Sequence, residues 1–194
     1  MNMKITDIKK LTDYHHLNLF CTTYTDRRKI QKQWIFASRS NPLSIKTDQR
    51  HSRPDAVVIV PFHIHEKKLV LIKEFRVALG GYQYGFPAGL VDEGESIEAS
   101  GTRELFEETG LNITRVQKKS PVVFSSSGLT DESVALLFVE CEGKPTNAHN
   151  EASEDIEVLL LSQKQSLDLL EDRQIKFDVK TWIVLNQFAA TGAI

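Results

Sequence analysis

Three glutamates spaced three and four residues apart, Glu104, Glu107 and Glu108, give the sequence its clearest chemical feature. In a helix, at about 100° per residue, their carboxylates fall within an arc of about 100° and project from one side. They lie in the last two turns of the predicted helix, where the helix dipole disfavours negative charge and like charges repel. A divalent cation would relieve both penalties, and oxygen ligands indicate Mg²⁺ or Mn²⁺. For three glutamates alone, the alternative is a solvated acidic helix face.

The helix that must position these carboxylates is predicted over Ser96–Thr109, after a Gly-Glu turn, and it ends at Gly110. Arg103 could pair with one carboxylate, such as Glu95, and fix the geometry. Short apolar runs around this helix predict strands, and two later stretches predict helices, so we expect an α+β or mixed α/β protein. The expected strands are DAVVIVPFHIH, KLVLIKEFR, Ser120–Phe124, Val134–Cys141 and Ile156–Leu161, and the expected helices are Lys164–Glu171 and Val179–Ala190.

The N-terminal part, from about Leu17 to Arg39, is predicted to form an antiparallel β-ribbon with a turn at TDRR. The polar stretch SNPLSIKTDQRHSRP that follows is interpreted as a linker, with a boundary near Ser52. We therefore expect a ribbon region over residues 1–52 and a second domain over residues 53–194.

Composition narrows the functional classes. The 194 residues are 41% hydrophobic and 26% charged, which suits a globular protein rather than a disordered chain. Their formal net charge of −2 argues against a non-specific nucleic-acid binder. Two cysteines cannot form a disulfide framework or a four-ligand zinc site. With no membrane-length apolar run and no apolar signal region, we expect a cytoplasmic, soluble protein.

The segment GLVDEGESIEASGTRELFEETGL places the three glutamates in a longer pattern. It fits the Nudix box at every fixed position: Gly89, five residues, Glu95, seven residues, then Arg103-Glu104-Leu105-x-Glu107-Glu108-x-Gly110-Leu111. The protein resembles the Nudix hydrolases. The resemblance implies an αβα sandwich whose helix and preceding loop hold catalytic metal, and hydrolysis of a nucleoside diphosphate linked to a further moiety.

A pyrophosphate is a poor electrophile because its negative charge repels a nucleophile. Metal ions held by Glu104, Glu107 and Glu108 would neutralise that charge and lower the pKa of a bound water. The resemblance adds the backbone carbonyl of Ala88 as a further metal ligand. We count Arg103 and Glu107 among the catalytic residues as well.

Flanking segments resemble the ADP-ribose pyrophosphatase branch of the family. LVLIKEFRVALGGYQYGFPAGLVDEGE carries EFR, GGY and FPAG before the box, and SPVVFSSSGLTDE resembles that branch's Ser-Pro-Gly loop. NEASEDIEVLLLS resembles its catalytic loop, which implies Glu154 as the general base, with Glu151 as second choice. The alternative for either residue is an exposed loop carboxylate.

In this branch the N-terminal ribbon helps to build a homodimer, and an aromatic residue there stacks on adenine, a position that Trp34 occupies. Its alternative is an interface or core tryptophan. Arg39 and Arg76 match positions that contact phosphate or ribose, with surface salt bridges as the alternative. By the same alignment Leu90 and Ser126 line the pocket.

The first functional hypothesis is hydrolysis of ADP-ribose to AMP and ribose 5-phosphate. The branch usually has a glutamate where Gly85 stands before FPAG, and a proline where Ser127 stands in the Ser-Pro-Gly loop. These two departures motivate a second hypothesis, in which the substrate is GDP-mannose, NADH or an oxidised nucleotide. A third is a non-catalytic nucleotide sensor, which the complete set of box carboxylates disfavours. The expected partners are a small nucleotide substrate and a second copy of the chain, with no nucleic acid and no membrane.

The histidines and cysteines are interpreted as structural. His63 and His65 alternate at a strand end and are expected to face solvent, although a two-histidine metal pair is an alternative. Cys21 and Cys141 fall in predicted strands and are expected to be buried thiols.

Overall fold

The computed structural model describes residues 3–40 and 53–194, and the chain divides into two compact units. The ribbon unit comprises Met1–Asp55 with Val122–Val134, and the sandwich unit comprises Ala56–Pro121 with Ala135–Ile194. The domain boundary expected near Ser52, and most of the expected linker, lie outside the described residues. Within the described residues, no helix is long and apolar enough to span a membrane.

The sandwich unit is built on a β-sheet in which β11, β5, β4, β10 and β8 lie side by side in that order. The short strands β6 and β7 pair with β5 and β4, respectively. The strands are β4 (Ala56–His63), β5 (Lys68–Arg76), β6 (Gly81–Gly85), β7 (Ala88–Leu90), β8 (Asn112–Lys119), β10 (Ser133–Glu142) and β11 (Ile156–Leu161), and the 3₁₀ turn η1 (Val77–Leu79) joins β5 to β6.

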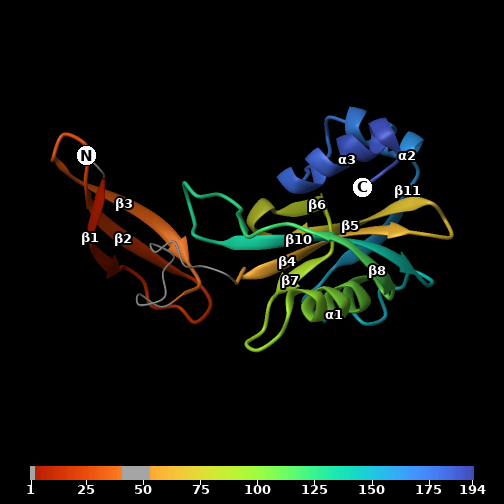
Figure 1. Cartoon of the computed structure of the whole chain (residues 1–194), viewed down its shortest axis with the longest axis horizontal. Helices are drawn as coiled ribbons and strands as arrows, with labels where there is room; N and C mark the ends of the chain where they lie inside the picture. The colour runs from red at the N-terminus through yellow and green to blue at the C-terminus, as the bar shows by residue number, and fades with distance from the viewer. Residues whose placement is uncertain (1–2, 41–52) are drawn as a thin grey trace. The chain divides into compact units, whose positions relative to one another are not determined.

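Three helices cover this sheet: α1 (Ile97–Thr109), α2 (Gln163–Glu171) and α3 (Val179–Thr191). Helix α1 lies on one side of the sheet, whereas α2 and α3 lie together on the other side (Figure 1). This arrangement is the expected αβα sandwich, and the mixed α/β class is confirmed.

The core forms where α1 meets the sheet. The continuous apolar runs of β4 and β5 are buried, as expected for strands covered on both faces. Leu105 of α1 packs in a cluster with Ile59 and Leu137. Gly101 lets the helix approach closely, because a Cβ there would lie 2.6 Å from the Leu137 Cδ2 atom.

The ends of α1 match the sequence prediction. The Ser96 hydroxyl oxygen accepts a hydrogen bond from the Ala99 N–H at 3.1 Å, which caps the first turn. Gly110 adopts a left-handed conformation with φ of 70°, and its N–H donates to the Phe106 carbonyl at 2.8 Å. The helix that carries the glutamates is therefore fixed at both ends.

The ribbon unit contains a three-stranded antiparallel sheet of β1 (Lys4–Lys10), β2 (Asn18–Thr25) and β3 (Gln31–Ser38). The predicted ribbon of β2 and β3 is confirmed, but β1 was not expected. Its side chains are almost all exposed, so KITDIKK lacks the alternating pattern of a half-buried strand. The unit also contains β9 (Val123–Phe124), which pairs with the first residues of β10.

Several local predictions were wrong. The strand expected over Ser120–Phe124 is only the short β9, while the longer β8 precedes it as an exposed, charged strand at the end of the sheet. His63 is buried rather than solvent-facing, and its Nε2 lies 2.9 Å from the Gly143 carbonyl oxygen. His65 is exposed as expected. Cys141 is buried, but Cys21 is only partly so.

Candidate functional site

The three glutamates of α1 differ sharply in burial. Glu108 is 5% exposed, and one of its carboxylate oxygens accepts a hydrogen bond from the Ala88 N–H at 3.1 Å. The side chains of Glu104 and Glu107 are 13% and 46% exposed. Burial is the main cause that raises the pKa of Glu108 to about 9, and burial also raises the pKa of Glu104. The three carboxylates of the predicted acidic face therefore differ in exposure, and Glu108 is the most buried of them.

Arg103 holds three carboxylates around one guanidinium group. Its Nε and Nη2 atoms donate to the two oxygens of Glu95, each at 3.2 Å, which confirms the predicted pairing. Its Nη1 atom donates to Glu104 at 2.7 Å and to Glu107 at 3.2 Å. The hydrogen bonds from Arg103 and then from Ser100 lower the pKa of Glu95 to about 2. The box arginine thus links the loop before α1 to the helix.

Strand β7 is fitted closely against α1. A Cβ added to Gly89 would lie 1.9 Å from a carboxylate oxygen of Glu104, so any larger residue there would force this carboxylate to shift. The carbonyl of Leu90 accepts a hydrogen bond from Arg103 Nη2 at 3.2 Å. Together with the Ala88–Glu108 bond, these contacts bring the expected metal ligands of strand and helix to one place.

The four glutamates of the box, Glu95, Glu104, Glu107 and Glu108, form an acidic cluster. Glu74 of β5 is a further member, and it was not predicted from the sequence. Its side chain is 16% exposed and forms an ion pair with Arg76 at 2.8 Å. Burial raises the pKa of Glu74, and the charge of Glu74 in turn helps to raise the pKa of Glu108. The available signal was a carboxylate two residues after the buried apolar run of β5.

The loop before β11 carries both candidate general bases. The Glu151 N–H donates to the Glu154 carboxylate at 2.9 Å, and the Glu154 N–H donates to the Glu151 carbonyl at 3.0 Å. Glu154 is half-buried, whereas Glu151 is exposed. Burial is the largest cause of the raised pKa values of Glu74, Glu104 and Glu108, and the charge of Glu154 is a smaller one. Glu154 therefore lies near the acidic cluster.

The acidic cluster matches a hard divalent cation in the chemistry of its donors, which are carboxylate and backbone oxygens in a buried, negatively charged setting. Over residues 3–40 and 53–194, no three histidine, cysteine or acidic side chains are arranged so that they could hold a metal ion directly. Here the Arg103 guanidinium supplies the positive charge beside Glu104 and Glu107. Metal binding would therefore require a rearrangement of these side chains.

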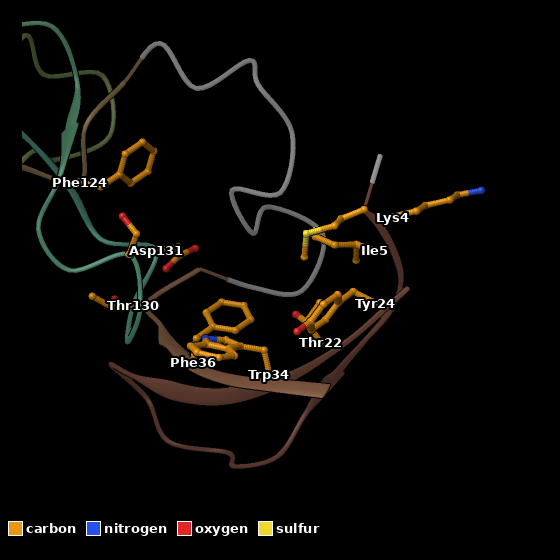
Figure 2. A pocket seen from close by; sticks show the side chains of 11 residues that line it. Lys4, Ile5, Thr22, Tyr24, Trp34, Phe36, Phe124, Thr130 and Asp131 are labelled. Carbon is orange, nitrogen blue, oxygen red and sulfur yellow. The ribbon is translucent and has the colours of Figure 1, made fainter. Parts of the chain in front are cut away.

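The ribbon unit has a pocket of a different kind, with a volume of about 680 Å³ (Figure 2). Figure 2 shows its aromatic side chains, Tyr24, Trp34, Phe36 and Phe124, with Thr130 and Asp131 nearby. Trp34 is 52% exposed, and its Nε1–H donates to the Gly128 carbonyl at 3.2 Å. Trp34 is therefore not a core residue, and its ring is available to a flat ligand.

The remaining predicted residues divide between the two units. In the ribbon unit, Arg39 lies 3.6 Å from the Glu132 carboxylate, and the Ser126 carbonyl accepts hydrogen bonds from the next turn. In the sandwich unit, Arg76 pairs with Glu74 at the end of β5, and Leu90 is 47% exposed at the end of β7. Arg76 and Leu90 thus accompany the acidic cluster, whereas Arg39, Ser126 and Trp34 belong to the ribbon unit.

Known proteins resemble this chain in sequence and in fold. The NUDIX domain profile matches residues 52–182. The ADP-sugar pyrophosphatase of Mus musculus is 36% identical over 125 residues, 63% of this chain and 54% of that protein. The ADP-ribose pyrophosphatase of Bacillus subtilis (strain 168) is 29% identical over 168 residues, 80% of this chain and 89% of that protein.

A solved structure of an ADP compounds hydrolase shares the fold. It matches with a TM-score of 0.73 at 20% sequence identity, over 98% of this chain and 95% of that chain. The chain spans about half the length of several curated relatives that it matches.

Proposed function

Because the chain belongs to the Nudix family, we propose that it hydrolyses the pyrophosphate bond of a nucleoside diphosphate derivative with the help of Mg²⁺ or Mn²⁺. The substrate proposed first is ADP-ribose, which would yield AMP and ribose 5-phosphate. The observation that carries this proposal is the buried acidic cluster, in which Arg103 joins Glu95, Glu104 and Glu107 beside the buried Glu108.

In this proposal the Ala88 carbonyl, Glu104, Glu107 and Glu108 would hold the ions. Bound divalent ions neutralise the charge of the pyrophosphate and lower the pKa of a bound water. The chain's own residues prepare the place. Glu108 is fixed by the Ala88 N–H, and Gly89 leaves space for the carboxylate of Glu104. The hydrogen bonds from Arg103 to Glu95 hold the loop before α1 in a fixed position relative to the helix.

Glu154 is the general base of this proposal, and Glu151 is the second choice. Glu154 would accept the proton of the attacking water, because its charge acts on the same carboxylates that would hold the ions. The Glu151 N–H fixes the orientation of the Glu154 carboxylate. Water adds to one phosphorus, the bridging P–O bond breaks, and two phosphate monoesters leave.

Recognition of the nucleotide is assigned to the ribbon unit and to the ends of β5 and β7. Trp34 would stack on the base, Arg39 and Arg76 would contact phosphate or ribose, and Leu90 and Ser126 would line the pocket. This division needs a homodimer if the ribbon of one chain serves its partner's site. Sedimentation at micromolar concentration tests that step, because a monomer would remove the shared-site role of Trp34.

The names of two relatives, an ADP-sugar pyrophosphatase and an ADP-ribose pyrophosphatase, support ADP-sugars as the substrate class. A second candidate is another nucleotide sugar or dinucleotide, favoured by Gly85, which leaves open space beside β6. A panel of ADP-ribose, GDP-mannose, NADH and an oxidised nucleotide, each assayed with Mg²⁺, separates the two. A clear preference for ADP-ribose supports the first candidate, and a preference for any other compound overturns it.

A further inference from the structure

A hydrogen bond crosses strand β5 and reaches the loop that carries Glu154. The Tyr82 hydroxyl, on β6, donates to the Asp155 carboxylate at 2.5 Å. Strands β6 and β11 both pair with β5, where Glu74 is opposite Gln83 in β6 and Ile156 in β11. Because Asp155 directly precedes β11, this bond ties the loop to the far side of β5.

The Tyr82 ring has two neighbours from β5. It contacts Phe75, its cross-strand neighbour, edge to face with ring centroids 5.5 Å apart. The Lys73 Nζ atom lies 5.0 Å from the ring centroid and also pairs with Glu157 of β11 at 3.1 Å. The ring is 43% exposed, so these contacts, rather than deep burial, fix the direction of its hydroxyl group.

Asp155 is also held through its backbone, since the Phe75 N–H donates to the Asp155 carbonyl at 3.1 Å. The residue therefore has one side-chain anchor on β6 and one backbone anchor on β5. The carboxylate of the neighbouring Glu154 is held by the hydrogen bond from the Glu151 N–H. The Tyr82 hydroxyl thus links β6 to this loop, so Tyr82 is well placed to set the position of the loop.

We propose that Tyr82 is a positioning residue, whose hydroxyl holds Asp155 and so directs the Glu154 carboxylate toward the acidic cluster. This role rests on the proposed function, in which Glu154 is the general base. Tyr82 touches neither substrate nor ion in this role. It acts on the rate through the loop, and its removal is therefore expected to lower kcat rather than to raise KM.

The first experiment compares Tyr82→Phe with the wild type, using ADP-ribose and Mg²⁺. The variant keeps the ring contacts and loses only the hydroxyl, so kcat is expected to fall about tenfold while KM changes less than about twofold. Tyr84→Phe, the same substitution two residues along β6, is the matched control and is expected to keep the wild-type kcat. A Tyr82→Phe variant with wild-type kcat would overturn the proposal.

Combined variants test whether Tyr82 acts through the loop. Asp155→Ala is expected to lose as much kcat as Tyr82→Phe, Asp155→Asn to recover part of it, and the double variant to be no worse than Asp155→Ala. In a Glu154→Gln background, Tyr82→Phe is expected to cause no further loss. Additive losses in either background, or a Glu154→Gln variant with full kcat, would overturn the positioning role.

Hydrogen exchange tests the anchor without any turnover. Amides of residues 150–156 are expected to exchange faster in Tyr82→Phe than in the wild type and in Tyr84→Phe. Unchanged exchange overturns the anchor whatever the activity. If exchange is faster in Tyr82→Phe, as expected, but the wild type hydrolyses no substrate of the panel, the proposed function is contradicted and the anchor is not.

Discussion

The acidic site of the sandwich unit and the pocket of the ribbon unit are built from opposite materials. In the first, the carboxylates of Glu104 and Glu108 are largely buried and accept hydrogen bonds from Arg103 and from the Ala88 N–H, respectively. In the second, exposed aromatic rings line a pocket of about 680 Å³ (Figure 2). Buried charge is costly to assemble, whereas an exposed ring is not.

This difference indicates a division of labour. A cluster of buried carboxylates that repel one another is a place for cations and for charge that develops during a reaction. A half-exposed indole suits the face of a flat ligand and contributes to binding. Changes in the sandwich unit should therefore alter kcat and the response to metal, and changes in the ribbon unit should alter KM.

The largest effect is expected for Glu108→Gln. Loss of the most buried carboxylate should lower kcat with ADP-ribose about 10³-fold, since a metal ligand contributes several kcal/mol to the transition state. The matched control is Glu98→Gln, on the same helix, where the exposed carboxylate pairs with Lys119. Equal losses in the two variants, measured as initial rates of AMP release, would break the comparison.

The stability of the metal-free protein should respond in the opposite direction. Burial raises the pKa of Glu108 to about 9 from 4.5, so between these values the unfolded chain loses its proton first and stability falls as pH rises. Glu108→Gln removes this penalty and is expected to raise the free energy of unfolding by up to about 3 kcal/mol near pH 7.

Urea unfolding in EDTA measures this change. The difference between Glu108→Gln and the wild type should shrink as the pH is lowered toward the usual range of a glutamate. A variant that is less stable than the wild type at neutral pH would contradict a burial penalty on the ionised form of Glu108.

Gly89→Ala sharpens the claim that the site depends on close fit. The new Cβ would overlap the Glu104 carboxylate, and the displaced ligand is expected to lower kcat about 10²-fold. Gly85→Ala is the comparison, because a Cβ there meets no atom within 4 Å. Steady-state kinetics over a range of Mg²⁺ should show a weakened metal response for Gly89→Ala alone.

Trp34→Ala should produce the smallest effect and a different one. Loss of stacking is expected to raise KM for ADP-ribose about tenfold with little change in kcat. Trp182→Ala, which removes an indole of similar exposure from α3, should leave KM unchanged. If Trp34→Ala lowered kcat at an unchanged KM, the division between the two regions would be wrong.

What the sequence could predict was local. The end of α1 at Gly110, its start to within one residue and the Arg103–Glu95 pair follow from spacing within about one segment, because helix geometry is set by near neighbours. The apolar runs of β4 and β5 likewise identified the buried strands. These features required no knowledge of how distant segments pack.

What the sequence could not predict depends on distant segments. The burial of Glu108 arises because β4 and β7 lie against α1, and the part played by Glu74 arises because its charge on β5 acts on Glu108. Strands β1 and β8 were missed because exposed, charged residues form them, and pairing with a neighbour is what makes them strands. The roles assigned to Glu151, Glu154, Trp34 and the arginines remain predictions.

The most direct measurement is AMP release from ADP-ribose by the EDTA-treated full chain as Mg²⁺ is added back. We expect no release before addition, a saturable rise with Mg²⁺, and AMP and ribose 5-phosphate in equal amounts. Release that is unaffected by EDTA, or no release at any Mg²⁺ or Mn²⁺ concentration from a folded protein, would contradict the assignment of the acidic cluster as a metal-dependent hydrolytic site.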